Sequence, residues 1–261
     1  MPDALWEEIE PLIPKPRDKH PLGCHRRRVP DRDAMNAIFF VLKTGCQWNA
    51  LNKTGICSSS ASHRRFQEWQ KKGVFKKIWK HTFERYDEIQ GIDWSFCSTD
   101  GAMTKSPLGG KKTGKNPTDR AKIGTKRSLT TDKNGIPLSC PVAGANKNDF
   151  KLLRETIVPL GLAMPGTSRS MCLDKGYDFE EVRLLLKELG WIPHIRTRGE
   201  EKVEKKNKKH PPKRWVVERT HSWMNRFRGL LIRWSKKVKN YQAQIYLVFA
   251  YITAARCGLL G

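Results

Sequence analysis

The apolar residues of this chain change their spacing near residue 94, and this change divides the chain into two kinds of structure. Before residue 94 they recur at helical spacing, as in Leu5, Trp6 and Ile9. After it, short apolar runs bounded by turn residues alternate with helical segments. The sequence therefore predicts an all-α region over residues 1–90 and an α/β domain over residues 91–261.

Four helices are expected in the first region, starting near residues 3, 31, 58 and 75. Asp31 and the serines at 58–60 can cap two of them, and Gly45 and Gly73 can end two. A short turn followed by a basic helix with interleaved aromatic residues resembles a helix-turn-helix DNA reader. An ordinary helical bundle with a solvated basic face fits this pattern equally well.

The second region carries alternating strand and helix patterns. The expected strands cover residues 94–99, 127–131, 137–143, 170–173 and 191–195, and the expected helices cover residues 150–160, 179–189 and two segments of 215–257 broken near Lys239 and Asn240. This order of elements is that of a ribonuclease-H-like fold, with a mixed five-stranded sheet flanked by helices. Residues 101–125 and 196–214, which are rich in lysine and poor in apolar residues, are expected to be basic loops.

The charge balance points to a polyanionic partner. Fifty Lys and Arg stand against 26 Asp and Glu, a formal net charge of +24. A compact fold with this excess repels itself unless it meets a partner such as nucleic acid, where each neutralised phosphate releases counterions. A ribosomal-type or nonspecific basic protein fits the same numbers, and composition says nothing about catalysis.

Cysteine usage and hydropathy indicate a protein of the cytoplasm. The seven cysteines form no Cys-x-x-Cys pair, which is typical of free thiols in a reducing compartment. The N-terminus has no basic segment followed by a long apolar stretch, so no secretory signal is expected. The most apolar window, residues 245–255, is too short to span a bilayer. We expect no membrane association.

Three carboxylates stand directly beside apolar segments. Asp100 closes the strand expected at 94–99, Asp174 follows the strand at 170–173, and Glu218 lies in the first turns of the helix near residue 215. A carboxylate near the core boundary needs a cation, because its burial alone is costly. Spacing alone leaves open whether that cation is an Arg or Lys side chain or a metal ion.

Phosphodiester chemistry would give such a set of carboxylates a use. In-line attack needs an activated water or 3′-hydroxyl and a stabilised leaving oxygen, which two divalent ions about 3.5–4 Å apart provide. Mg²⁺ prefers hard oxygen ligands. Three negative charges in a protein of net charge +24 suit a metal site and make little sense as a DNA contact.

Several ordered motifs resemble transposases of the insertion sequence 5 family and cover nearly the whole chain. They lie at residues 44–48, 65–69, 98–105, 124–138, 143–149, 172–178 and 215–228. By this resemblance Asp100, Asp174 and Glu218 match the family's DDE metal ligands, which hold two Mg²⁺ ions for which Mn²⁺ can substitute. The family fold is ribonuclease-H-like, behind a helical DNA-binding region.

The resemblance also implies a reaction, partners and a place in the cell. The reaction is strand cleavage at the terminal inverted repeats of the element, followed by transfer of the freed 3′-hydroxyl into target DNA. The partner is double-stranded DNA, on which a homodimer holds two ends, in the bacterial cytoplasm with the nucleoid. The alternative is a catalytically inactive or domesticated transposase that only binds DNA, and a structural RNA-binding protein is a weaker third option.

Candidate DNA contacts are basic residues near these motifs, for each of which a solvated surface position is the alternative. They are Arg26, Arg27, Arg28, Arg64, Arg65, Lys126, Arg127, Lys175, Arg214, Arg219, Arg226 and Arg228. Related transposases often have Tyr and Lys at two positions near the catalytic Glu that are Pro211 and Asn225 here. Trp223, Phe227, Trp234 and Tyr246 are expected in the core, and His221 either touches substrate or caps the pocket.

Overall fold

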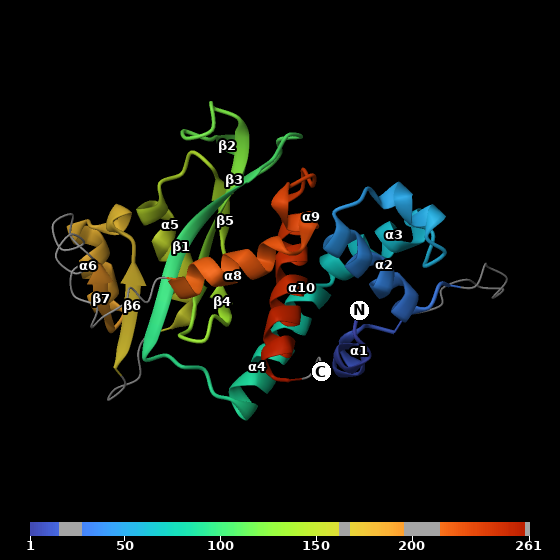
Figure 1. The fold of residues 1–261 in the computed structure, drawn as a ribbon, viewed down its shortest axis with the longest axis horizontal. Helices are drawn as coiled ribbons and strands as arrows, with labels where there is room; N and C mark the ends of the chain where they lie inside the picture. The colour runs from blue at the N-terminus through green and yellow to red at the C-terminus, as the bar shows by residue number, and fades with distance from the viewer. Residues whose placement is uncertain (16–27, 162–167, 196–214, 259–261) are drawn as a thin grey trace. The chain divides into compact units, whose positions relative to one another are not determined.

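The computed structural model describes residues 1–15, 28–161, 168–195 and 215–258 (Figure 1). The chain forms two compact units. The first contains residues 1–89, 226–231 and those from 239 on, and the second contains residues 90–225 and 232–238. The second unit begins at residue 90, and the residues from 239 on group with the N-terminal region instead of with the sheet.

The first unit is all-α. Its helices are α1 (Asp3–Ile9), α2 (Asp31–Thr44), α3 (Ser59–Lys71), α4 (Val74–Ile89), α9 (Arg228–Leu231) and α10 (Val238–Arg256), with short 3₁₀ turns at Glu10–Leu12 and Trp48–Lys53. The four helices expected before residue 90 are confirmed. Gly45 ends α2 in the left-handed conformation with φ 71°, and Ser58 Oγ accepts a hydrogen bond from Ala61 N at 3.4 Å at the start of α3.

Aromatic packing explains why the C-terminal helix belongs to this unit. The rings of Trp79 on α4 and Tyr246 on α10 stack with centroids 5.3 Å apart, and Phe249 packs edge-on to Trp79 at 5.5 Å. Phe227 contacts both Phe39 and Tyr251. Apolar burial of this kind is the main driving force for helix packing.

The second unit is built on one mixed sheet. Its strands are β1 (Phe96–Lys105), β2 (Gly114–Lys115), β3 (Ile123–Thr131), β4 (Pro137–Ser139), β5 (Val142–Gly144), β6 (Arg169–Leu173) and β7 (Trp191–Ile195). The order is β2-β3-β1-β6-β7, and β4 and β5 also pair with β3. β1 pairs antiparallel with β3 and parallel with β6, which pairs parallel with β7. The mixed α/β prediction is confirmed, with seven strands among the described residues where five were expected.

Helices cover both faces of the sheet in this unit. Arg127 on β3 donates to Asn225 on α8 (Trp215–Asn225), while its neighbour Ser128 accepts from Thr156 on α5 (Asp149–Ile157). Because successive strand residues point to opposite faces, α8 and α5 lie on opposite sides of β3 (Figure 1). Another helix of this unit, α6 (Glu180–Glu188), packs beside β7.

Two expectations about segment boundaries were wrong. Residues 101–125 are not one loop, because β1 continues to Lys105 and pairs with β3 from Gly124 on. Small and charged residues make up much of this pairing, so the sequence shows no apolar alternation that would predict a strand here. The described residues from 215 on form three helices, with gaps at residues 226–227 and 232–237, both before Lys239. In the second gap Trp234, which was expected in the core, is 55% exposed.

One expected capping role was also wrong. Asp31 is the first residue of α2 rather than its cap, since the cap position is Pro30. None of the described helices is both long and apolar enough to cross a membrane.

Candidate active site

Asp100 and Asp174 lie on neighbouring strands of the second unit. The parallel register of β1 and β6 pairs Ser98 with Cys172. Two residues further along each strand stand Asp100, inside β1, and Asp174, directly after the end of β6. Adjacent strands are about 4.8 Å apart, so this register brings the two aspartates to one place on the sheet.

The backbone fixes both carboxylates in the same way. Gly101 N donates to Asp100 Oδ1 at 2.8 Å, and Lys175 N donates to Asp174 Oδ1 at 2.7 Å. The buried phenol of Tyr177 lies close enough to both aspartates for their charges to affect its pKa. Burial raises the pKa of Tyr177, and the negative charges of Asp149, Asp100 and Asp174 raise it further. Three carboxylates therefore lie within electrostatic reach of one hydroxyl.

Glu218 lies on α8, the helix that packs on β1 and β3. The helix is anchored in its middle and at its C-terminal end, because Thr220 Oγ1 donates to Gly135 O at 2.8 Å and Arg127 donates to Asn225 Oδ1 at 3.1 Å. In the antiparallel pairing of β1 with β3, Asp100 and Arg127 point to the same face. That face is the one that α8 covers, and the side chain of Glu218 is exposed there.

His221, one helical turn after Glu218, is buried with 7% of its surface exposed. Burial and the nearby Arg127 charge lower the pKa of His221 to about 3, and the backbone of Asp100 opposes both. The imidazole is therefore neutral at pH 7 and lies against β1 at Asp100. The alternative that His221 fills the space behind the site fits this placement better than substrate contact.

The three predicted ligands are gathered on one unit without forming a closed metal cluster. Among the described residues, no group of three or more His, Cys, Asp or Glu side chains lies close enough to hold a metal ion. The register places two of them together, and the third comes from the helix that crosses the same face.

Asp149, the first residue of α5, is a carboxylate that the sequence analysis did not single out for this site. Its Oδ2 accepts from Lys126 Nζ at 2.9 Å. Its Oδ1 lies so close to Gly101 that a Cβ added there would collide with it. Two sequence signals could have found it, namely the glycine directly after Asp100 and the motif at residues 143–149.

The structure separates the candidate DNA contacts into exposed and buried residues. Arg64, Lys175, Arg226 and Arg228 are exposed, whereas Lys126 and Arg127 are 4% and 2% exposed and bond to Asp149 and Asn225. Arg219 is partly buried, with its guanidinium over the rings of Trp215 and Trp223 at 4.5 and 4.7 Å. The candidates Arg26, Arg27 and Arg214 lie outside the described residues.

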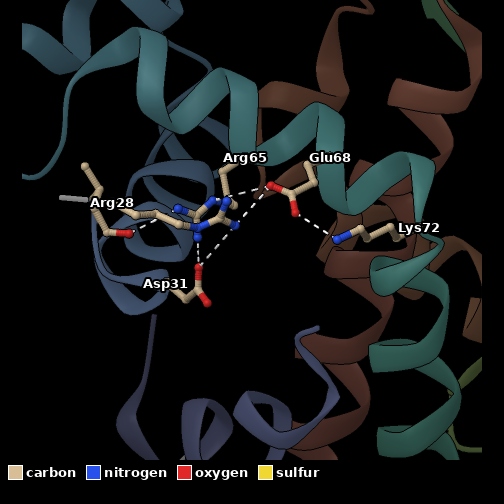
Figure 2. Close-up of polar contacts among 6 residues, drawn as sticks. Arg28, Asp31, Arg65, Glu68 and Lys72 are labelled. Carbon is tan, nitrogen blue, oxygen red and sulfur yellow. Dashed lines mark hydrogen bonds and ion pairs between the residues drawn. The ribbon is translucent and has the colours of Figure 1, made fainter. Parts of the chain in front are cut away.

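Arg65 lies inside an ion-pair network of the helical unit (Figure 2). It pairs with Asp31 and, at 3.8 Å, with Glu68, and it donates to the backbone oxygen of Val29 at 3.1 Å. Arg28, whose side chain is 35% exposed, reaches the same Glu68 at 3.0 Å. Only 5% of Arg65 is exposed, so its geometry favours a structural role over DNA contact.

Two family models match the chain in succession. Residues 1–79 match the model described as "Putative transposase of IS4/5 family", and residues 87–253 match the one described as "Transposase DDE domain". The second match alone covers more than half of the chain. The chain belongs to the DDE transposases of the IS4/IS5 group. The expected resemblance is thereby confirmed.

Two relatives from Burkholderia cepacia align with about half of this transposase. A protein described as "Putative transposase for insertion sequence element IS402" is 39% identical over 145 residues, which cover 53% of this chain and 67% of the relative. The "Insertion element IS402 uncharacterized 16.2 kDa protein" is 33% identical over 116 residues, which cover 44% of this chain and 79% of that protein.

Solved structures of other transposases are more distant. A piggyBac transposase synaptic complex with hairpin DNA is 12% identical with a TM-score of 0.45, over 92% of this chain and 69% of that one. A Mos1 strand transfer complex is 13% identical with a TM-score of 0.28, over 93% and 82%. Similarity at this level adds nothing to the assignment of function.

Proposed function

We propose that this transposase binds the terminal inverted repeats of its own insertion sequence and cuts the DNA there by metal-dependent phosphoryl transfer. The freed 3′-hydroxyl is then joined to target DNA. Asp100, Asp174 and Glu218 hold the metal ions. The observation that supports this proposal is the parallel register of β1 and β6, which pairs Ser98 with Cys172, two residues before each aspartate.

The donor chemistry of these residues fits a pair of Mg²⁺ ions, for which Mn²⁺ can substitute. Carboxylate oxygens are the hard ligands that Mg²⁺ prefers. The chain has a net charge of +24, so its surface generally attracts the phosphates of DNA. Three carboxylates form a local negative site on that surface. When bound, such ions activate the attacking water or hydroxyl and stabilise the leaving oxygen.

The surrounding residues keep the carboxylates in place. The backbone N–H bonds from Gly101 and Lys175 hold one oxygen of each aspartate in a single orientation. His221 stays neutral, so it adds no positive charge that would compete with a cation for Asp100. The bonds of Thr220 and Asn225 anchor α8, and the helix thereby carries Glu218 to the same face of the sheet.

The net charge of the chain and its exposed arginines and lysines support DNA binding. Arg64, Lys175, Arg226 and Arg228 are the candidates whose exposure allows phosphate contact. Two ends must be held together before they are joined to a target. We therefore propose a homodimer on DNA as the working form.

The test is cleavage of DNA carrying the element's own ends, by the wild type and by Asp174→Ala. Loss of one ligand should slow cleavage by about a thousandfold, roughly 4 kcal/mol of transition-state stabilisation, with end binding retained. Asp178→Ala is the matched control, because this neighbouring carboxylate pairs with Arg183 at the surface. Equal cleavage by wild type and Asp174→Ala would disprove the metal-site assignment.

The same assay distinguishes an active transposase from the alternative, a protein that only binds DNA. A wild-type protein that binds the ends and never cuts them, with Mg²⁺ or with Mn²⁺, would be a domesticated or inactive transposase that acts through DNA binding alone. Short inverted repeats flanking the gene would argue for mobility of the element.

A further inference from the structure

Arg233, in the second unit, is a buried arginine whose hydrogen-bonding capacity is fully used. It is 1% exposed. A guanidinium carries five N–H groups, and all five donate here. The acceptors are the backbone oxygens of Ser235 (2.9 Å), Lys111 (2.8 Å), Lys112 (3.2 Å) and Lys236 (3.0 Å) and the hydroxyl of Thr125 (2.7 Å).

These bonds join two segments that are more than 100 residues apart in sequence. We call residues 109–113 and 232–237, held by Arg233, the Arg233 clamp. Arg233 N also donates to Lys105 O at 2.8 Å, so the clamp is tied to the end of β1. At Gly110, with φ 117°, an added Cβ would collide with the backbone of Lys236. The two segments are therefore packed backbone against backbone in a fixed arrangement.

The clamp presents four lysines to solvent. Lys111, Lys112, Lys236 and Lys237 are all exposed. Lys112 has Glu155 within 3.9 Å, an exposed pair whose attraction is weak. Four like charges held on one rigid frame repel each other, and a row of phosphates relieves that repulsion. Lysine is suited to this task, because it contacts phosphate as a point charge and needs no particular base.

Trp234 stands in the middle of the second clamp segment and is 55% exposed. In sequence, the buried Arg233 precedes Trp234, and the exposed Lys236 and Lys237 follow after Ser235. A large aromatic side chain in this position offers an apolar face for the sugar beside a contacted phosphate.

We infer that the Arg233 clamp is a surface that binds the phosphate backbone of duplex DNA, with four lysines on phosphates and Trp234 against the sugars. The inference rests on the DNA binding proposed above and not on the proposed cleavage. Because it uses the backbone alone, the surface should bind DNA of the element's end and unrelated DNA equally well.

The experiment measures binding of the full chain to duplex DNA in EDTA, so that cleavage plays no part. One duplex carries the element's terminal repeat and the other a scrambled sequence. Each phosphate-bound lysine adds about 1 to the slope of log affinity against log salt. The double variants K111A/K112A and K236A/K237A should each lower the slope by about 2, and the quadruple variant by about 4, on both duplexes.

The control double variant is K133A/K187A, which removes two exposed lysines of the same unit away from the clamp. Its slope should equal that of the wild type. Replacing all four clamp lysines by arginine should preserve the slope, and Trp234→Ala should weaken binding with no change in slope. Arg233→Lys keeps the charge but has only three donors, so it should lower the slope; if it does not fold, the lysine variants still decide.

A wild-type slope in the quadruple variant would overturn the inference while leaving the proposed cleavage intact. A loss confined to the terminal-repeat duplex would overturn the claim of backbone binding in favour of end recognition. Tighter binding of single-stranded RNA than of either duplex would overturn the choice of DNA as the partner.

Discussion

The carboxylate of Asp149 occupies the space that a side chain at Gly101 would need, one residue after Asp100. Its Oδ1 lies against Gly101, and its Oδ2 is held by Lys126 Nζ at 2.9 Å. The strand that carries Asp100 is thus supported from the α5 face of the sheet by a carboxylate held in place by a buried lysine.

Gly101→Ala should therefore damage both the fold and the site. The new Cβ must displace Asp149 or β1, which costs about 1–3 kcal/mol of unfolding free energy. A displacement of about 1 Å at Asp100 can slow catalysis about a hundredfold. Urea unfolding and the cleavage assay measure the two effects.

Gly176→Ala is the matched control, because nothing lies within 4 Å of its added Cβ. Its unfolding free energy should stay within about 0.5 kcal/mol of the wild type. Equal stability of the Gly101 and Gly176 variants would show that the close approach of Asp149 to Gly101 is not present in solution.

Lys126 should contribute to stability and not to DNA affinity. Lys126→Met leaves the carboxylate of Asp149 without its cation. Because the Asp149 side chain is 37% exposed, the expected cost is about 1–3 kcal/mol, below that of a fully buried pair. Lys122→Met, which breaks an exposed pair with Asp119, should cost under about 1 kcal/mol. If Lys126→Met lost DNA affinity at unchanged stability, Lys126 would be a DNA contact after all.

Arg64 and Arg65, neighbours on α3, should also differ in whether they contribute to stability or to DNA affinity. Arg65→Ala removes the buried partner of Asp31 and one of the cationic partners of Glu68, and it should cost about 3 kcal/mol, at the low end for a buried pair because both partners are 26% exposed. Arg64→Ala removes an exposed side chain and should leave the thermal midpoint unchanged. DNA affinity should respond in the opposite order, and the reverse result for both residues would contradict this division.

The pairs 64/65 and 126/127 show what the sequence could and could not predict. Helices, strands and their order follow from local spacing, and these were predicted well. Whether a basic residue faces the solvent depends on partners far along the chain, such as Asp31 for Arg65 and Asn225 for Arg127. No local pattern carries that information.

The residues of the candidate active site also divide into those that the sequence predicted and those that it did not. Asp100 and Asp174 could be placed from their positions at apolar strands, because parallel register brings such residues together. Asp149 was missed, because its role depends on a contact between α5 and β1 at Gly101. The Arg233 clamp was missed for a similar reason, since residues 101–125 looked like one unpaired basic loop.

Asp132, buried at the end of β3, should give the stability of the fold a distinct pH dependence. Burial raises the pKa of Asp132 to about 6, although the backbone N–H groups of Ile136, Asp93 and Asn134 donate to it and oppose the shift. The ordinary value is 3.8, so the folded state binds the proton more tightly than the unfolded chain. Protonation therefore favours folding, and this group makes the fold less stable as pH rises from about 4 through about 6.

The size of this effect is about 3 kcal/mol, from roughly two pKa units at 1.36 kcal/mol each. Other carboxylates, such as Asp93 and Glu155, have lowered pKa values and act in the opposite direction, so the raw pH curve is a sum. The measurement is the difference in unfolding free energy between wild type and Asp132→Asn from pH 4 to pH 8. That difference should shift in favour of the variant as pH rises, and parallel curves across the range would show that Asp132 titrates normally.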